Sequence, residues 1–214
     1  MKYVLLGLFL LVSVIHLAAA FFGKEKLRKV SKMFLMPFLL AYFIAARGSV
    51  YLPVLFALIF AFLGDYFLLE PQKRIRFQLG LASFLIGHLC YIPAFISHTA
   101  SFHIPVFIIS YIIAAAIGIF IFKKLNPVKN MIIPVMAYMI IILNMSVFAL
   151  QMMLSNLMSW SVMVFIGSVL FICSDTILAF VTFHTMPKRG NFLVMIFYIT
   201  AQAFIVIGLS RVIS

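Results

Sequence analysis

Acidic residues are scarce in this sequence: its 214 residues include four Asp and Glu against 16 Lys and Arg. Charged residues of all kinds amount to 9%, while 66% of the residues are hydrophobic and the mean hydropathy is +1.26. A soluble domain of this length cannot hide so much apolar surface in one core. The composition therefore excludes an ordinary soluble fold and predicts that lipid surrounds most of the chain.

Cysteine is also scarce, and the motifs of several enzyme classes are missing. Cys90 and Cys173 both lie in apolar segments without CxxC or Cys/His spacing, so neither a disulfide framework nor a zinc site is predicted. The sequence has no G-x-S-x-G elbow, no H-E-x-x-H and no phosphate-binding glycine-rich loop. These absences argue against serine hydrolases and zinc proteases, and we expect no metal or other cofactor.

Long apolar runs fill the rest of the sequence. A membrane-spanning helix needs about 20 apolar residues, with roughly 17 to 25 tolerated. The runs predict an all-α, polytopic transmembrane bundle of eight spans in a single domain, residues 1–214. The second span is the weakest, because it is short, contains Pro37 and reaches a spanning length only if Lys32 extends its amine to the interface. The predicted spans are approximately 3–22, 30–46, 50–69, 77–97, 105–122, 131–150, 160–183 and 192–212.

Basic residues are distributed very unevenly among the connections. Those after spans one, three, five and seven carry 5, 3, 3 and 2 Lys and Arg, and the other side holds Lys2, Arg47 and Arg211. By the positive-inside rule, both termini are outside and the basic loops are cytoplasmic. Because one Lys precedes the first apolar run and five basic residues follow it, the run is a span rather than a signal peptide. We expect an integral protein of a bacterial inner (cytoplasmic) membrane.

Two of the four acidic residues, Asp65 and Asp175, lie inside predicted spans. A carboxylate deep in a membrane costs roughly 2.5 to 3.5 kcal/mol on insertion scales, which favours a functional role over a merely structural hydrogen-bonded pair. Both spans run outside to inside, so the carboxylates lie about 6 and 12 Å below the cytoplasmic boundary at a rise of 1.5 Å per residue. At these depths the two side chains can share one pocket toward the cytoplasmic leaflet.

The surroundings of the two aspartates are similar in sequence. Both follow the pattern small–Asp–x–x–Leu, in Gly64–Leu68 and in Ser174–Leu178, and each lies in the third span of a four-span half. This short echo is compatible with a 4+4 parallel repeat. Further polar residues in the spans predict a polar pocket lined by spans three, four, six, seven and eight, although each alone is more often a hydrogen-bonding link between helices. They include His88, Tyr91, Asn144, Ser168, Ser174, Thr182, Tyr198 and Gln202.

Two carboxyl groups in a poorly solvated pocket suit acid catalysis. One can keep its proton and act as the donor while its partner is anionic. This pairing fits the cleavage of a bond through an oxocarbenium-like cation.

Four stretches, in the order "GDYFLL", "GLASFLIGHLCYI", "LFICSDTILAF" and "YITAQAFIVIG", resemble the YhhN family of lysoplasmalogenase-like membrane proteins. The resemblance implies hydrolysis of the vinyl ether bond of a lysoplasmalogen to a fatty aldehyde and glycerophosphoethanolamine or glycerophosphocholine. It implies Asp65 and Asp175 as the acid pair. Greater depth and the lack of nearby loop cations favour Asp175 as the acid, and the reverse assignment stays open. The residues expected to bind or orient the substrate are His88, Tyr91, Asn144, Ser174, Tyr198 and Gln202, with Lys73, Arg74, Arg76 or Lys188 at the phosphate.

Two other classes of function remain open at this stage. Intramembrane Asp and His residues and a 4+4 repeat also describe a proton-coupled transporter. A non-catalytic lipid-binding membrane protein is the third alternative. The expected partners are a lysophospholipid substrate and the anionic lipids facing the basic loops, rather than nucleic acid. The sequence leaves the oligomeric state open.

Overall fold

The computed structural model describes residues 1–70, 73–184 and 189–212, and within these ranges the chain is helical with no strand. The predicted helical bundle is confirmed, and each of the eight predicted spans falls on one long helix. The helices are α1 (Lys2–Phe21), α2 (Glu25–Arg47), α3 (Leu52–Phe67), α4 (Arg74–Ile96), α5 (Ile104–Leu125), α6 (Ile132–Ser155), α7 (Ser159–Phe183) and α8 (Gly190–Val212), with a short 3₁₀ helix, η1 (Lys129–Met131), before α6.

The short helix is α3 rather than α2, so the expectation that the second span is the weakest is wrong. Helix α2 begins at Glu25 and has 23 residues, whereas α3 begins beside Pro53 and has 16 residues. At 1.5 Å per residue α3 is about 24 Å long, less than the roughly 30 Å hydrocarbon thickness. Seven described helices are long and apolar enough to cross a membrane, and α3 is the shorter apolar helix beside them.

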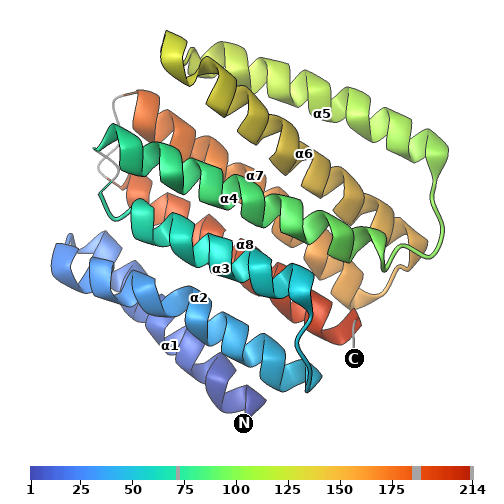
Figure 1. Cartoon of the computed structure of the whole chain (residues 1–214), viewed down its shortest axis with the longest axis horizontal. Coiled ribbons are helices and arrows are strands. Elements are labelled where there is room, and N and C mark those ends of the chain that lie inside the picture. The colour runs from blue at the N-terminus through green and yellow to red at the C-terminus, as the bar shows by residue number, and fades with distance from the viewer. Residues whose placement is uncertain (71–72, 185–188, 213–214) are drawn as a thin grey trace.

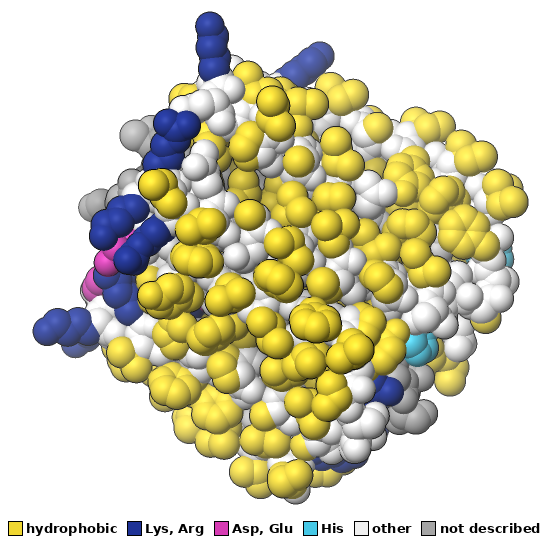
Figure 2. Space-filling model, viewed as in Figure 1, with side chains coloured by type: hydrophobic (Ala, Val, Ile, Leu, Met, Phe, Trp, Pro, Cys, Tyr) yellow, Lys and Arg dark blue, Asp and Glu magenta, His cyan; other side chains and the backbone are white. Residues whose placement is uncertain are grey.

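The helices pack as antiparallel neighbours (Figure 1). Helices α3 and α4 lie next to each other with α7 and α8 behind them, while α1 and α2 cover one edge and α5 the other. The C-terminal ends of α1, α3, α5 and α7 and the N-terminal ends of α2, α4, α6 and α8 lie at one end of the bundle, which we call the basic end. Most of the Lys and Arg side chains visible in Figure 2 project along this end. The two termini lie at the opposite end.

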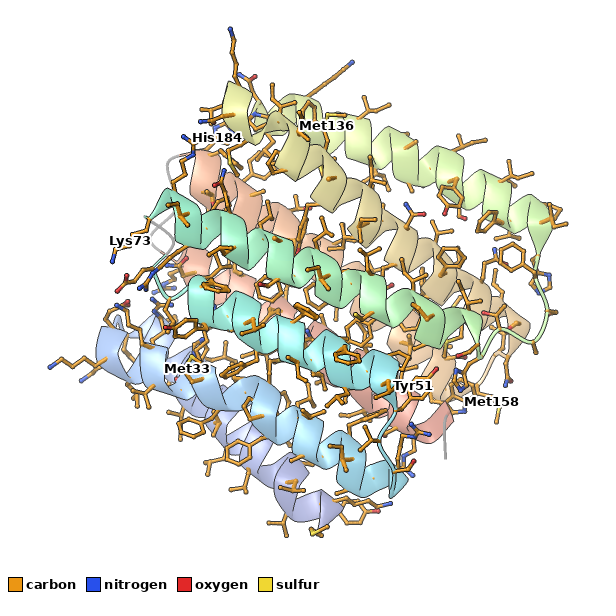
Figure 3. All side chains as sticks on the ribbon, viewed as in Figure 1. Met33, Tyr51, Lys73, Met136, Met158 and His184 are labelled. Atoms are coloured by element: carbon orange, nitrogen blue, oxygen red, sulfur yellow. The ribbon has the colours of Figure 1, made fainter. Side chains whose placement is uncertain are left out.

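Figure 3 shows the same separation for labelled side chains: Lys73 and His184 lie at the basic end, and Tyr51 and Met158 lie at the other. The segregation of basic residues is what the positive-inside prediction requires. That the basic end faces the cytoplasm stays a prediction.

Glycine allows α7 and α8 to approach each other closely. A Cβ atom placed on Gly167 would lie 2.9 Å from the Ala201 carbonyl oxygen and 3.0 Å from the Ile205 backbone nitrogen. These are backbone atoms, which cannot move aside as the end of a flexible side chain can. Small residues at such a crossing are the usual means of close helix packing in membranes.

Gly167→Val is therefore expected to destabilise the protein by about 1–3 kcal/mol, the usual cost of overpacking. Gly7→Val is the matched control, because a Cβ on Gly7 meets nothing within 4 Å. The measurement is thermal unfolding of the two variants in detergent, followed by circular dichroism. Equal melting temperatures for the two variants would contradict this account of the α7–α8 contact.

Candidate functional site

A cavity of about 240 Å³ opens at the basic end, between α2, α3, α4, α7 and α8. We call it the polar cavity. Its mouth includes the exposed side chains of Glu25 and Asn191. The wall of this cavity includes residues of α2 and none of α6. The expectation that span six lines the pocket is therefore wrong for this cavity. Its polar wall residues are Glu25, Arg28, Lys32, Asp65, Ser174, Asp175, Asn191 and Tyr198.

Asp65, on the last turn of α3, is 1% exposed and is contacted by one cation and one hydroxyl group. The Tyr198 hydroxyl of α8 donates a hydrogen bond of 2.8 Å to Asp65 Oδ2. Lys32 Nζ of α2 lies 3.2 Å from Asp65 Oδ1. Lys32 is itself buried, and its amine lies in the wall of the polar cavity beside Asp65. An ammonium at this distance in a poorly solvated site stabilises the anionic form of the carboxyl group.

Asp175 lies in the C-terminal half of α7 and has a different set of neighbours. The Tyr138 hydroxyl of α6 donates a hydrogen bond to Asp175 Oδ2. His88 Nε2 of α4 lies 3.0 Å from the Tyr138 hydroxyl and 3.4 Å from the same carboxylate oxygen. No Lys or Arg is paired with Asp175 among the described residues. The other carboxyl oxygen, Oδ1, is therefore the one free to carry a proton or meet a ligand.

The two aspartates are held in matching ways by the two halves of the chain. Each is contacted by the helix that precedes its own, α2 for Asp65 and α6 for Asp175. Each is also contacted by the last helix of the other half, α8 for Asp65 and α4 for Asp175. This is the pairing that a 4+4 repeat would produce, and the repeat itself stays a prediction. The halves differ in the chemistry of one contact: the helix before α3 presents the ammonium group of Lys32 to Asp65, whereas the helix before α7 presents the hydroxyl group of Tyr138 to Asp175.

Asp175 stands at the boundary between two kinds of space. Besides the polar cavity, it lines a narrow cavity of about 60 Å³ between α4, α5, α6 and α7, which we call the apolar cavity. The walls of the apolar cavity are almost entirely hydrocarbon, including Phe77, Leu81, Ile142 and Ile172. Asp65 lines the polar cavity but not the apolar cavity. An amphiphile lying across this boundary would have its polar part near Asp65 and its apolar part beyond Asp175.

The other predicted ligand-orienting residues are divided between this site and other places. Ser174 and Tyr198 line the polar cavity, and His88 lies behind Asp175. Tyr91 is not in either wall and donates a 2.7 Å hydrogen bond to Gln202 Oε1 between α4 and α8. Two more pairs lie outside the site: Asn144 accepts a hydrogen bond from the Tyr111 hydroxyl, and Ser168 lies 3.0 Å from Ser146.

The cations predicted to meet a phosphate lie outside the polar cavity where the structure describes them. Lys73 and Arg76 form ion pairs of 2.8 and 2.7 Å with Glu70, and Arg74 is exposed. The hydrogen bond from Lys73 and the charge of Arg76 hold the pKa of Glu70 below its ordinary value. Lys188 lies outside the described residues.

Two cations in the wall of the polar cavity, Arg28 and Lys32 of α2, were missed as site residues by the sequence analysis. Their spacing of four puts them on one helical face, which is the signal that could have found them. Tyr138 carries no such signal, because it lies within the long apolar run of α6. In the described part of the chain, no three His, Cys, Asp or Glu residues come together in a group that could hold a metal ion.

Comparison with protein-family models gives a match to the model described as the YhhN family, over residues 27–209. The matched range includes every residue of the two aspartate clusters described above. Neither the comparison with curated proteins nor that with solved structures gave a match.

Proposed function

The chain belongs to the YhhN family, and on that premise we propose that it hydrolyses the vinyl ether bond of lysoplasmalogens. The products are a fatty aldehyde and glycerophosphoethanolamine or glycerophosphocholine. The observation that carries the proposal is the position of the two carboxyl groups. They come from α3 and α7 and both line the polar cavity, and Asp175 also lines the apolar cavity beside it.

Asp175 is the general acid in this proposal. Hydrolysis of a vinyl ether begins when a proton is transferred to the β-carbon, which is the alkene carbon bonded to the hydrocarbon chain. Asp175 lines the apolar cavity as well as the polar one, so it lies on the chain side of the site. The Tyr138 hydroxyl group occupies Oδ2, which leaves Oδ1 for the transferred proton. General acid catalysis requires the donor oxygen to lie within hydrogen-bonding distance of the atom that receives the proton.

Asp65 is the anion that stabilises the resulting cation. Protonation of the β-carbon leaves an oxocarbenium ion, whose positive charge lies on the α-carbon and the ether oxygen. Asp65 lies on the polar side, where the ammonium group of Lys32 favours the anionic form of the carboxyl group and the Tyr198 hydroxyl fixes its geometry. A fixed carboxylate in a poorly solvated site stabilises such a charge more effectively than water does. It also orients the water molecule that attacks the α-carbon.

The remaining steps need no other reactant. The attacking water forms its bond to the α-carbon and loses a proton to a carboxylate, which gives a hemiacetal. The bond between the α-carbon and the glycerol oxygen then breaks. The hemiacetal hydroxyl group loses its proton to become the aldehyde, and the glycerol oxygen gains a proton to leave as a hydroxyl group. One water is consumed, and the proton first given to the β-carbon is returned by the attacking water.

The headgroup phosphate is bound at the mouth of the polar cavity by Arg28. Arg28 lines the cavity and is held by Glu25, whose Oε1 lies 2.7 Å from Arg28 Nη2. Guanidinium groups match the geometry of phosphate oxygens and can bind two of them at once. Lys32 is nearer the carboxylates and is engaged by Asp65.

Arg28→Gln is expected to raise KM about tenfold, since a charge-assisted hydrogen bond contributes roughly 1.5 kcal/mol, with little change in kcat. The same substitution at Arg74, which is exposed outside the cavity wall, is the control and should leave both constants unchanged. Steady-state kinetics with a lysoplasmalogen in mixed micelles measures the two constants. A rise in KM for Arg74→Gln but not for Arg28→Gln would place the phosphate at the α3–α4 connection instead.

The test of the proposed function is aldehyde release by the purified protein. A lysophospholipid with a vinyl ether chain should give aldehyde, whereas the saturated ether with the same headgroup and chain length should give none. Reconstituted liposomes then separate the alternatives. Proton- or substrate-dependent flux without lipid turnover would favour the transporter, and binding of both lipids without turnover or flux would favour a non-catalytic lipid-binding protein.

A further inference from the structure

A groove of about 650 Å³ runs along the outside of the bundle between α5 and α7, with α6 as its floor. Its walls are apolar over nearly their whole area, and they include Ile113 and Ile117 of α5, Leu150 of α6, and Phe165 and Val169 of α7. Helix α5 covers the edge of the bundle and its buried residues are Ser110, Gly118 and Leu125. The space beside it is therefore left open to the surrounding lipid rather than filled by side chains.

This groove adjoins the apolar cavity, which in turn adjoins the polar cavity. It shares Ile121, Leu143, Ile172 and Thr176 with the apolar cavity. The apolar cavity in turn shares Asp175 with the polar cavity. Apolar side chains therefore extend without interruption from the lipid-facing surface of the bundle to the chain side of Asp175.

We infer that the groove binds the hydrocarbon chain of a single-chain amphiphile, which enters sideways from the membrane. A chain that moves from the bilayer into this groove exchanges one apolar environment for another, so its transfer is nearly neutral in free energy. The polar contacts at the basic end then determine which lipid stays. The expected occupant has one chain because the substrate of the proposed function has one hydrocarbon chain. The assignment of Asp175 as the reacting group rests on the proposed function, whereas binding of the chain does not require turnover.

The probe is a saturated ether lysophospholipid that carries a diazirine in the middle of its chain and cannot be cleaved. After irradiation with the purified full-length protein, crosslinks are expected on the α5 and α7 segments that form the groove. Unlabelled saturated ether lysophospholipid at ten times its Kd should reduce them about tenfold, because mass action leaves about one site in eleven free. A diacyl phospholipid with the same headgroup should reduce them much less.

A matched pair of variants tests the path between groove and site. Ile121→Trp places a large ring where the groove meets the apolar cavity, and is expected to abolish both the competed crosslinks and aldehyde release. Ile112→Trp, on the same helix at a position that is 65% exposed, should leave both unchanged. Elution in size-exclusion chromatography checks that both variants are folded.

The outcomes separate this inference from the proposed function. Competed crosslinks in the groove, without aldehyde release from the vinyl ether lipid, would support the chain site and overturn the reaction. Aldehyde release with crosslinks that map elsewhere, or that the competitor does not reduce, would overturn the chain site and leave the reaction standing. Full activity of Ile121→Trp would also overturn it.

Discussion

Asp175→Asn is expected to lower the rate of aldehyde release by about 10²- to 10⁴-fold, the usual contribution of a positioned general acid. The amide keeps the shape of the side chain and still accepts a hydrogen bond from Tyr138 through its oxygen. It has no proton that it can transfer to the β-carbon. The loss should therefore appear in kcat, while binding of the uncleavable saturated ether lipid stays close to that of the parent protein.

The control for this variant is Glu70→Gln, which also removes one negative charge at the basic end. Glu70 is paired with Lys73 and Arg76 outside the polar cavity, so its neutralisation should leave aldehyde release unchanged. Infrared spectroscopy gives a second readout, because a protonated carboxyl group has a carbonyl stretch distinct from that of a carboxylate. Asp175→Asn should remove this band and Asp65→Asn should retain it. Full activity of Asp175→Asn, or loss of the band in Asp65→Asn alone, would reject the assignment.

Most of the fold could be predicted because the relevant signal is local. A run of about 20 apolar residues specifies a spanning helix by itself, and every predicted span falls on a described helix. The ends are less predictable: α2 begins at Glu25, five residues before the predicted start, because its first turn is polar. Helix α3 ends at Phe67 although the apolar run continues through Leu69, so the length of the run overestimates the length of the helix.

The candidate site could be predicted in part. Asp65 and Asp175 stand out because a carboxylate in an apolar run is costly. Counting residues to the ends of their predicted spans places both in the same half of the bilayer. Their partners depend on which helices touch, which the sequence does not show. Asn144 attracts attention for the same reason as the aspartates, yet it is satisfied by Tyr111 and by the Ile140 carbonyl oxygen away from the polar cavity. Polarity in a span therefore identifies residues that need a partner, but not the partner.

The chemical difference between the two halves gives the site its direction. If Lys32 and Tyr138 occupy equivalent positions in the two halves, a symmetric framework holds one aspartate beside a cation and the other beside neutral hydroxyl and imidazole groups. In the proposed mechanism these different neighbours separate the roles of anion and acid, which is the arrangement that acid–base pairs require. In the proposed function the same asymmetry orients the lipid, since Asp65 lines the polar cavity and Asp175 also lines the apolar cavity.

The Lys32–Asp65 ion pair provides the second prediction with a large effect. Asp65→Asn is expected to lower the rate by about 10²- to 10³-fold, because it removes the charge that stabilises the cation. It also leaves the buried ammonium group of Lys32 without its partner, and Lys32→Met leaves the carboxylate alone. Breaking a buried pair from either side costs about 3–5 kcal/mol, so each single variant should be destabilised. Lys29→Met, at a partly exposed position of α2, should have little effect.

The double variant Lys32→Met/Asp65→Asn separates stability from catalysis. With both charges gone, no unpaired ion is buried, so its melting temperature should recover toward that of the parent protein, as a double-mutant cycle would measure. Aldehyde release should nevertheless stay as low as in Asp65→Asn, because the carboxylate is still missing. A purely structural ion pair predicts the opposite, with activity restored along with stability. Restored activity in the double variant would assign Lys32 and Asp65 to holding α2 against α3 and leave Asp175 without an anionic partner.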